Sequence, residues 1–198
     1  MLNFIPNLIK NDQMALTPSN MLALGTTAPA FNLPQTNSNK IIRFENCKGQ
    51  NGTVVIFMCN HCPFVIHIME GLVALANEYK AKGLGFVAIS SNDIENYPQD
   101  GPNEMEQFAE HYKMPFPYLY DASQEVAKAY DAACTPDLYV FNTEDKLVYR
   151  GQLDGSRPNN GVAVTGEDLR LALNAVIENR PQVENQKPSM GCGIKWKK

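Results

Sequence analysis

The residues best suited to chemistry form one short run, Cys59-Asn60-His61-Cys62-Pro63. Two thiols three positions apart can close a small disulfide and open it again, and the thiolate is the nucleophile in that exchange. The run follows a β-branched apolar stretch, Thr53–Met58, and precedes apolar residues at helical spacing. Free N–H groups and the positive dipole end of a helix N-terminus both favour thiolate over thiol. The sequence therefore predicts a redox-active dithiol at a strand–helix junction.

A metal site and a pair of inert buried thiols are the other interpretations of Cys59 and Cys62. A structural zinc site usually takes four ligands from two such pairs, whereas the other three cysteines are isolated along the chain. The polar Asn60-His61 dipeptide between the thiols does not favour simple burial. We therefore expect no metal, although a copper or zinc carrier that uses both thiols and a histidine stays open as an alternative.

Length and composition indicate a folded domain and exclude several classes of protein. The chain has 198 residues, 44% of them hydrophobic, and a formal net charge of −4. This length suggests one domain with extensions, because a domain takes about 150 residues. No run approaches the roughly 18 apolar residues of a membrane span, so we expect no membrane partner. The acidic balance without a basic block argues against nucleic acid as a partner.

The cysteine content indicates the compartment. Five cysteines are an odd number, and their spacing does not match a disulfide framework. Structural disulfides need an oxidising compartment, and residues 1–13 lack the charged start and the cleavage site of a signal peptide. We therefore expect a cytoplasmic protein.

The elements that must position the dithiol follow from the apolar pattern. The order is strand, helix, strand, two short helices with a strand between them, hairpin and helix, which indicates a parallel pair with a right-handed crossover. The later hairpin adds antiparallel strands, so we expect an α/β protein with a mixed central sheet flanked by helices. The expected strands are Ile41–Cys47, Thr53–Met58, Leu84–Ser90, Phe116–Tyr120, Leu138–Phe141 and Leu147–Arg150; the expected helices are Pro63–Lys82, Glu104–Tyr112, Gln124–Tyr130 and one from a capping box at Thr165–Asp168 to about Asn179.

Three segments divide the chain. Residues 1–21 are expected to form an N-terminal extension, residues 22–180 the domain, and residues 181–198 a polar, proline-containing tail that ends in Gly-Cys-Gly-Ile-Lys-Trp-Lys-Lys. Loops are predicted for residues 91–103 and 156–164, which are rich in Asn, Pro and Gly.

With these motifs, residues 22–180 resemble the thioredoxin superfamily. Cys59 and Cys62 match its CxxC motif, and Thr135-Pro136, just before an expected strand, matches its cis-proline. The segment GTTAPAFNL, residues 25–33, looks like the entry segment of the AhpC/TSA (peroxiredoxin-like) branch. The run FMCNHCPF, residues 57–64, and the ending GCGIKW are similar to a peroxiredoxin-like group that carries a CxxC motif.

The resemblance implies a thioredoxin-like fold and a thiol–disulfide oxidoreductase. Cys59 and Cys62 would be the catalytic couple, and Asn60, His61 and the Thr135-Pro136 dipeptide would border the substrate, because in that superfamily the backbone beside the cis-proline pairs with the bound substrate. No bound cofactor is implied, because the thiols carry the electrons. The implied partners are a protein or small-molecule disulfide and a thiol reductant such as the thioredoxin system or glutathione.

Two departures from the family patterns bear on mechanism. Thioredoxin has a buried Asp six residues before its first Cys, whereas Thr53 stands here and its strand has no carboxylate. Proton transfer must then use water, His61 or a residue elsewhere. Typical peroxiredoxins place Thr and Pro where Cys59 and Val55 stand, so a thiol peroxidase with Cys62 as the peroxidatic residue is the second hypothesis.

The order of attack within the couple and the roles of two more cysteines stay open. By analogy Cys59 attacks and Cys62 resolves, although Pro63 suits the first helical position and would make Cys62 the N-cap. Cys134, near Pro136, and Cys192, between two glycines, are candidates for an auxiliary redox role; their alternatives are a buried small residue and a tail that packs by its Ile and Trp.

Nothing in the sequence indicates a redox or catalytic role for the fifth cysteine or for the histidines and arginines outside the CxxC run. Cys47 is expected to be structural, and His67 and His111 to be partly exposed helix residues. Arg150 and Arg157 are expected to be surface charges, with anion binding or orientation of a substrate as the alternative.

Overall fold

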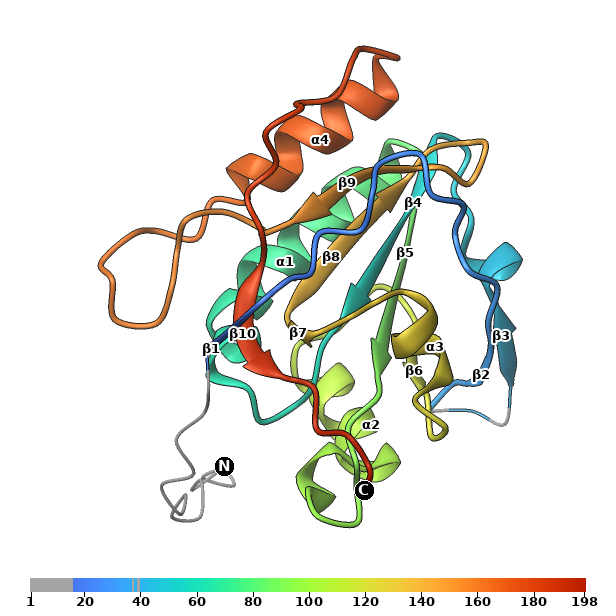
Figure 1. Cartoon of the computed structure of the whole chain (residues 1–198), viewed down its shortest axis with the longest axis vertical. Helices are drawn as coiled ribbons and strands as arrows, with labels where there is room; N and C mark the ends of the chain where they lie inside the picture. Colours follow the sequence, from blue (N-terminus) through green and yellow to red (C-terminus); the bar gives the residue numbers. More distant parts are fainter. Residues whose placement is uncertain (1–15, 37, 39) are drawn as a thin grey trace.

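The computed structural model describes residues 16–36, 38 and 40–198, so residues 1–15 of the extension predicted at residues 1–21 lie outside the described residues. Its core is a mixed sheet of five strands in the order β6-β5-β4-β8-β9 (Figure 1). The pairs β4–β5 and β5–β6 are parallel, and β4–β8 and β8–β9 are antiparallel, as the strand–helix–strand order and the hairpin predict. The bounds are β4 Gly52–Phe57, β5 Leu84–Ser90, β6 Tyr118–Tyr120, β8 Asp137–Phe141 and β9 Leu147–Gly151.

The central strand β4 separates two apolar layers. All six of its residues are buried, and successive side chains point to opposite faces. Val54 and Ile56 pack with the long helix and the last helix, whereas Val55 and Phe57 pack with the aromatic side chains of the other face. This burial on both faces explains the continuous β-branched run.

In the part of the chain that the structure describes, four α-helices flank the sheet (Figure 1): α1 Pro63–Ala81, α2 Pro102–His111, α3 Glu125–Ala129 and α4 Glu167–Ile177. The long helix α1 has Pro63 in its first turn and ends before Gly83, whose φ of 83° suits glycine. Its buried stripe is the predicted one: Val65, Ile68, Met69, Leu72, Leu75, Ala76 and Tyr79. Within the described ranges, none of the helices has the length and apolar character needed to cross a membrane.

Two local predictions were wrong. Of the strand expected at Ile41–Cys47, only β3 Ile41–Arg43 forms, paired with β2 Asn32–Pro34. The Asn46 side chain accepts the Arg43 N–H (2.9 Å) and the chain turns into a 3₁₀ helix, η1 Phe44–Cys47, which buries Phe44. The predicted loop at residues 91–103 likewise contains a short 3₁₀ helix, η2 Pro98–Asp100.

The capping box predicted for the last helix is also absent from α4. Its N-cap is Gly166, with φ 71°, and no side chain caps it. Instead, Oδ2 of the distant Asp154 accepts the N–H groups of Thr165 (2.7 Å) and Gly166 (2.6 Å). The carboxylate of Asp154 thus accepts N–H groups at the start of the helix, where a capping side chain within the helix's own first turn was expected.

The C-terminal segment adds a strand that its composition did not indicate. β10 Met190–Gly193 lies between β1 Leu16–Pro18 and β7 Cys134–Thr135, antiparallel to both (Figure 1). Ile194 is buried as expected, whereas Trp196 stays 41% exposed.

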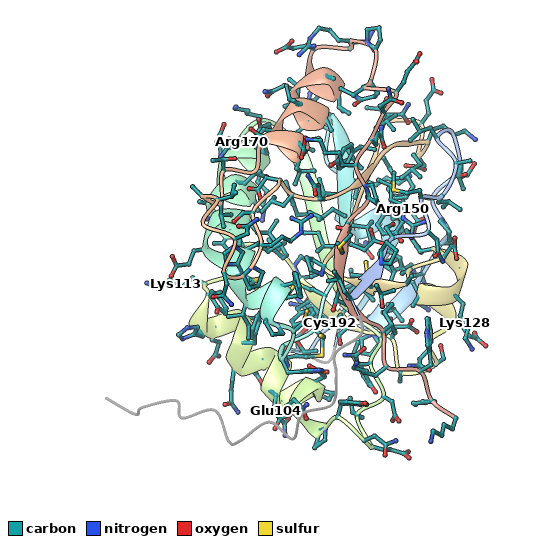
Figure 2. The ribbon with its side chains drawn as sticks, turned by 60° about the vertical axis from the view of Figure 1, so that its left-hand side comes forward. Glu104, Lys113, Lys128, Arg150, Arg170 and Cys192 are labelled. Carbon is teal, nitrogen blue, oxygen red and sulfur yellow. The ribbon has the colours of Figure 1, made fainter. Side chains whose placement is uncertain are left out.

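Arg150 corrects another expectation, because it is fully buried (Figure 2) rather than on the surface. Its Nη2 donates to Oδ2 of Asp137 (2.9 Å) and to the Asp131 carbonyl (2.6 Å), and its guanidinium lies over the Tyr139 ring. Arg157 is half-buried and donates to the Asp154 carbonyl (2.7 Å). Arg150 is therefore held by partners 13 and 19 residues away in the chain, and Arg157 by contacts within its own loop.

Candidate active site

The two thiols of the CxxC run meet at the junction of β4 and α1. Cys59 follows β4 by two residues, and Cys62 is the N-cap of α1, with extended backbone angles and Pro63 directly after it. Both residues are buried. The Thr135–Pro136 bond is cis, as the family resemblance implies. Sγ of Cys59 lies 3.4 Å from Oγ1 of Thr135, and Sγ of Cys62 lies 3.2 Å from its carbonyl oxygen. The structure thus brings the four residues together.

The surroundings place the negative charge of the reduced pair on Cys62. Burial alone would raise the pKa of Cys62, but hydrogen bonds from the thiols of Cys192 and Cys59 and from the Val65 N–H outweigh it and lower that pKa well below 9.0. The Thr135 carbonyl accepts from neutral Cys62 and so opposes this effect, but it is one acceptor against several donors.

The pKa of Cys59 is shifted in the other direction, upward. Its pKa lies well above 9.0, first because its thiol donates to Cys62, then because it is buried, and then because the Asp100 carboxylate is close. At neutral pH the reduced pair therefore holds a single proton, on Cys59. Thiolate character, which nucleophilic attack requires, is available at Cys62.

Asp100 is a site residue that the sequence analysis missed. Its side chain is fully buried, and its Oδ1 accepts the backbone N–H of Asn60 (2.9 Å). Oδ2 accepts Nδ2 of Asn92 (2.8 Å) and lies 2.7 Å from Nδ1 of His61. Asp100 ends η2, far from the CxxC run in sequence, so no motif spacing points to it. The signal was indirect: strand β4 lacks the carboxylate that thioredoxin has there.

Asn60 and His61, which were expected to border the substrate, are held by the protein itself. The Asn60 side chain donates to the Gln99 carbonyl (3.0 Å) and accepts from the Tyr118 hydroxyl (3.1 Å). The His61 ring stacks on Tyr97, with centroids 5.7 Å apart and planes 8° apart. Both residues remain half-buried, so the loop between the thiols is fixed against residues 97–100.

The two auxiliary candidates differ. Cys192 lies opposite Thr135 in the β10–β7 register, is buried, and its thiol donates to Cys62. The Cys134 thiol instead points to the Pro136 carbonyl (3.9 Å), and burial raises its pKa. The structure therefore places Cys192, rather than Cys134, against the dithiol. Cys47 lies in the opposite apolar layer, where burial raises its pKa to about 12.

One group of side chains among the described residues has the geometry to approach a metal ion. Donor atoms of Cys59, His61 and Asp100 lie within 4.8 Å of one another. The group differs from the carrier considered above, because Asp100 takes the place of Cys62. Both carboxylate oxygens of Asp100 already accept N–H groups, so we interpret it as a hydrogen-bonding centre.

The fold and the site together define a class of protein. A mixed sheet of parallel and antiparallel strands, a CxxC pair where β4 meets α1 and a cis-proline directly after the threonine that contacts both sulfurs are the features of a thioredoxin-like redox protein. Within that class the chain belongs to the AhpC/TSA family, whose model matches residues 24–150.

Solved structures extend the likeness to nearly the whole chain. An uncharacterized conserved protein from Geobacillus kaustophilus is 58% identical, with a TM-score of 0.91, over 93% of this chain and 97% of that one. A hypothetical protein from Sinorhizobium meliloti 1021 is 44% identical, with a TM-score of 0.89, over 91% and 98%.

A curated relative carries a functional name. The thiol-disulfide oxidoreductase ResA of Oceanobacillus iheyensis is 28% identical over 138 residues, which are 66% of this chain and 66% of that protein. The chain therefore spans just under two thirds of the length of this relative.

Proposed function

We propose that the protein is a thiol–disulfide oxidoreductase that uses Cys59 and Cys62 as its redox couple. One observation carries the proposal: the two thiols meet at the N-terminus of α1, where Thr135 lies 3.4 Å from the Cys59 sulfur and 3.2 Å from the Cys62 sulfur, directly before the cis-proline. The name of the curated relative supports the same activity.

The first step is attack by Cys59 on a substrate disulfide. This order follows the family resemblance, because both thiols are buried and the half-buried Asn60-His61 loop lies between them. As the Cys59 sulfur bonds to one substrate sulfur, its proton passes to Cys62 along their hydrogen bond. The other substrate sulfur leaves as a thiolate, and neutral Cys62 donates to the Thr135 carbonyl.

The second step resolves the mixed disulfide. Cys62 gives its proton to the departing thiolate or to water, which its lowered pKa favours, and then attacks the Cys59 sulfur. The Cys59–Cys62 bond forms, the bond to the substrate breaks, and the second substrate sulfur leaves as a thiolate. The chain has lost two electrons and the substrate has gained them.

Asp100 and His61 form the proton path that strand β4 lacks. Asp100 is the carboxylate that raises the pKa of Cys59, and His61 lies against it with its side chain 19% exposed. When the couple is reduced again, Cys59 can therefore take up its proton from water through His61 and Asp100. In this role the pair acts on Cys59 in every catalytic cycle.

The proposal includes partners and a compartment. The substrate is a protein or small-molecule disulfide, and the oxidised couple is restored by a thiol reductant such as the thioredoxin system or glutathione. We also propose the reducing cytoplasm as the site of action, which fractionation of cells that express the protein would test.

The test is disulfide exchange with trapped intermediates. The reduced chain should reduce oxidised glutathione, and peptide mapping should find a Cys59–Cys62 disulfide. Cys62→Ser should accumulate the mixed disulfide on Cys59. Cys47→Ser, in the other apolar layer, should match the unmodified protein. A mixed disulfide that forms only on Cys62 in Cys59→Ser would reverse the order of attack, and no reversible oxidation of either thiol would exclude the proposal.

A thiol peroxidase is a second candidate, favoured by the lowered pKa of Cys62 at a helix N-terminus. The Cys62 thiolate would attack the peroxide O–O bond, form a sulfenic acid and release water or alcohol. Cys59 would then condense with it, release water and give the same disulfide. Consumption of hydrogen peroxide faster than of oxidised glutathione would favour this candidate.

A further inference from the structure

The C-terminal strand β10 brings a third thiol to the proposed couple. Cys192 pairs with Thr135, the residue that contacts both sulfurs of the couple. Cys192, which is labelled in Figure 2, is 2% exposed. Its thiol donates to the Cys62 sulfur, and this contact is the first cause of the raised Cys192 pKa. Cys62 thus has two neighbouring thiols, Cys59 and Cys192.

We infer that Cys192 is a third redox-active thiol, which exchanges with Cys62 so that the oxidised chain holds a Cys62–Cys192 disulfide as well as the Cys59–Cys62 disulfide. This inference rests on the proposed function, because the substrate disulfide is the oxidant that creates the first bond. It assigns a chemical role to a strand that the proposed couple does not need.

The exchange is balanced without another reactant. Cys192 releases its proton to water and attacks the Cys62 sulfur of the Cys59–Cys62 disulfide. The Cys62–Cys192 bond forms, the Cys59–Cys62 bond breaks, and Cys59 leaves as a thiolate. Cys59 then takes up a proton through Asp100 and His61, so the chain neither gains nor loses electrons. Cys59 becomes free again while the chain remains oxidised.

The sequence around Cys192 suits this position. A Cβ atom on Gly191 would lie 2.0 Å from the Thr135 carbonyl oxygen, so only glycine lets β10 approach β7 this closely. The strand pairs with β7 through Cys192 and Gly193 and with β1 through three residues. This close approach holds the Cys192 sulfur against Cys62.

The segment after β10 ties Cys192 to the rest of the site. The Lys195 N–H donates to Oδ1 of Asn92 (2.9 Å), and the Asp93 N–H donates to the Lys195 carbonyl (2.8 Å). The same Asn92 side chain donates to Asp100 (2.8 Å), the carboxylate beside Cys59. The third thiol and the proton path of Cys59 therefore share one hydrogen-bonded framework.

The experiment equilibrates the full chain with reduced and oxidised dithiothreitol, quenches it with acid, alkylates free thiols and maps disulfides by mass spectrometry. We expect Cys59–Cys62 and Cys62–Cys192 peptides in the unmodified protein. Cys59→Ser treated with oxidised glutathione should form Cys62–Cys192 directly. The map of the unmodified protein needs no variant, so it is independent of any folding defect.

A substitution pair gives the quantitative test. Cys192→Ser keeps a hydrogen-bond donor but cannot form the second disulfide. The oxidation equilibrium constant of the unmodified protein is the sum of the constants for the two disulfides. Cys192→Ser should lower it by a factor of one plus the ratio of Cys62–Cys192 to Cys59–Cys62, which is about twofold if the two disulfides are equally populated. Cys134→Ser, in the neighbouring strand, is the matched control and should leave the constant unchanged.

The outcomes separate this inference from the proposed function. A Cys59–Cys62 disulfide alone, with an equilibrium constant that Cys192→Ser does not change, overturns the third thiol and leaves the proposed function standing. A disulfide to Cys134 in place of Cys192 overturns the assignment. If neither Cys59 nor Cys62 oxidises reversibly, the proposed function fails and the inference fails with it.

Discussion

Sγ of Cys62 lies 3.2 Å from the carbonyl oxygen of Thr135, the residue before the cis-proline. Neutral Cys62 therefore has an acceptor for its proton, while its thiolate has donors in Cys59, Cys192 and the Val65 N–H. Each protonation state of Cys62 finds partners in the folded protein. A thiol that must receive a proton in one step and lose it in the next needs this arrangement.

The charge on Cys62 can be measured without access to the buried sulfur. Thiolates absorb near 240 nm, so a pH titration of the reduced protein should show one thiolate well below pH 9. Cys62→Ser should remove it. Cys192→Ala deletes the first donor and should raise the pKa of Cys62, whereas Cys192→Ser should raise it less. Equal titrations of the two Cys192 variants would contradict the role of that donor.

The same thiolate makes stability depend on pH. The pKa of Cys62 is lower in the folded chain than its unfolded value of about 8.5. Its contribution is complete above that unfolded value and is lost as pH falls through the folded pKa. The free energy of unfolding of the reduced protein, relative to Cys62→Ser, should rise between pH 5 and pH 8 by up to about 1.4 kcal/mol per unit.

Chemical denaturation under reducing conditions measures this dependence. Cys47→Ser is the control, because burial raises the Cys47 pKa to about 12 and the thiol stays neutral over the same range. The difference between Cys47→Ser and the unmodified protein should not change from pH 5 to pH 8. Parallel curves for Cys62→Ser and the unmodified protein would show that Cys62 is not ionised in the folded state.

Asp100→Asn tests the carboxylate beside Cys59. Removal of its charge should lower the pKa of Cys59, so alkylation of Cys59 in a Cys62→Ser background should move to lower pH. Loss of the proton path should also slow repeated turnover, by a factor of about 100 or more if it acts in general acid–base catalysis. A lowered pKa with an unchanged turnover rate would leave Asp100 a purely electrostatic role. Asp93→Asn, in the same loop, is the charge control.

The sequence predicted the elements that carry the dithiol and missed much of what surrounds it. β4, α1 and β5 follow from local apolar periodicity, which needs no knowledge of the fold. β10 was missed because Gly-Cys-Gly has no apolar alternation, and its pairing depends on close backbone approach to Thr135. Asp100 was missed because only the folding of the loop before α2 brings it to the couple.

The misjudged Arg150 gives a stability prediction. Asp137→Asn would leave a buried guanidinium without its counter-charge, which costs about 3–5 kcal/mol. Denaturation at pH 8 measures this, because burial raises the pKa of Asp137 to about 6 and the carboxylate is ionised above it. Asp131→Asn, whose side chain is 50% exposed and 3.9 Å from Arg150, should cost less than about 1 kcal/mol. Equal losses would refute the buried pair as the anchor of Arg150.

Gly191→Ala tests whether close packing of β10 holds Cys192 at the couple. The new Cβ would meet the Thr135 carbonyl oxygen at 2.0 Å, so β10 must move away from β7. Alkylation of Cys192 in the reduced protein should then speed up by at least about tenfold, which corresponds to about 1.4 kcal/mol of lost local stability. Gly155→Ala, where a Cβ meets nothing within 4 Å, should leave the rate unchanged. An unchanged rate in Gly191→Ala would mean that the contacts of β1 and of the segment after Gly193 suffice to hold the strand. In that case Gly191 would only allow the close approach of the two backbones, and it would not be needed to hold Cys192 against Cys62.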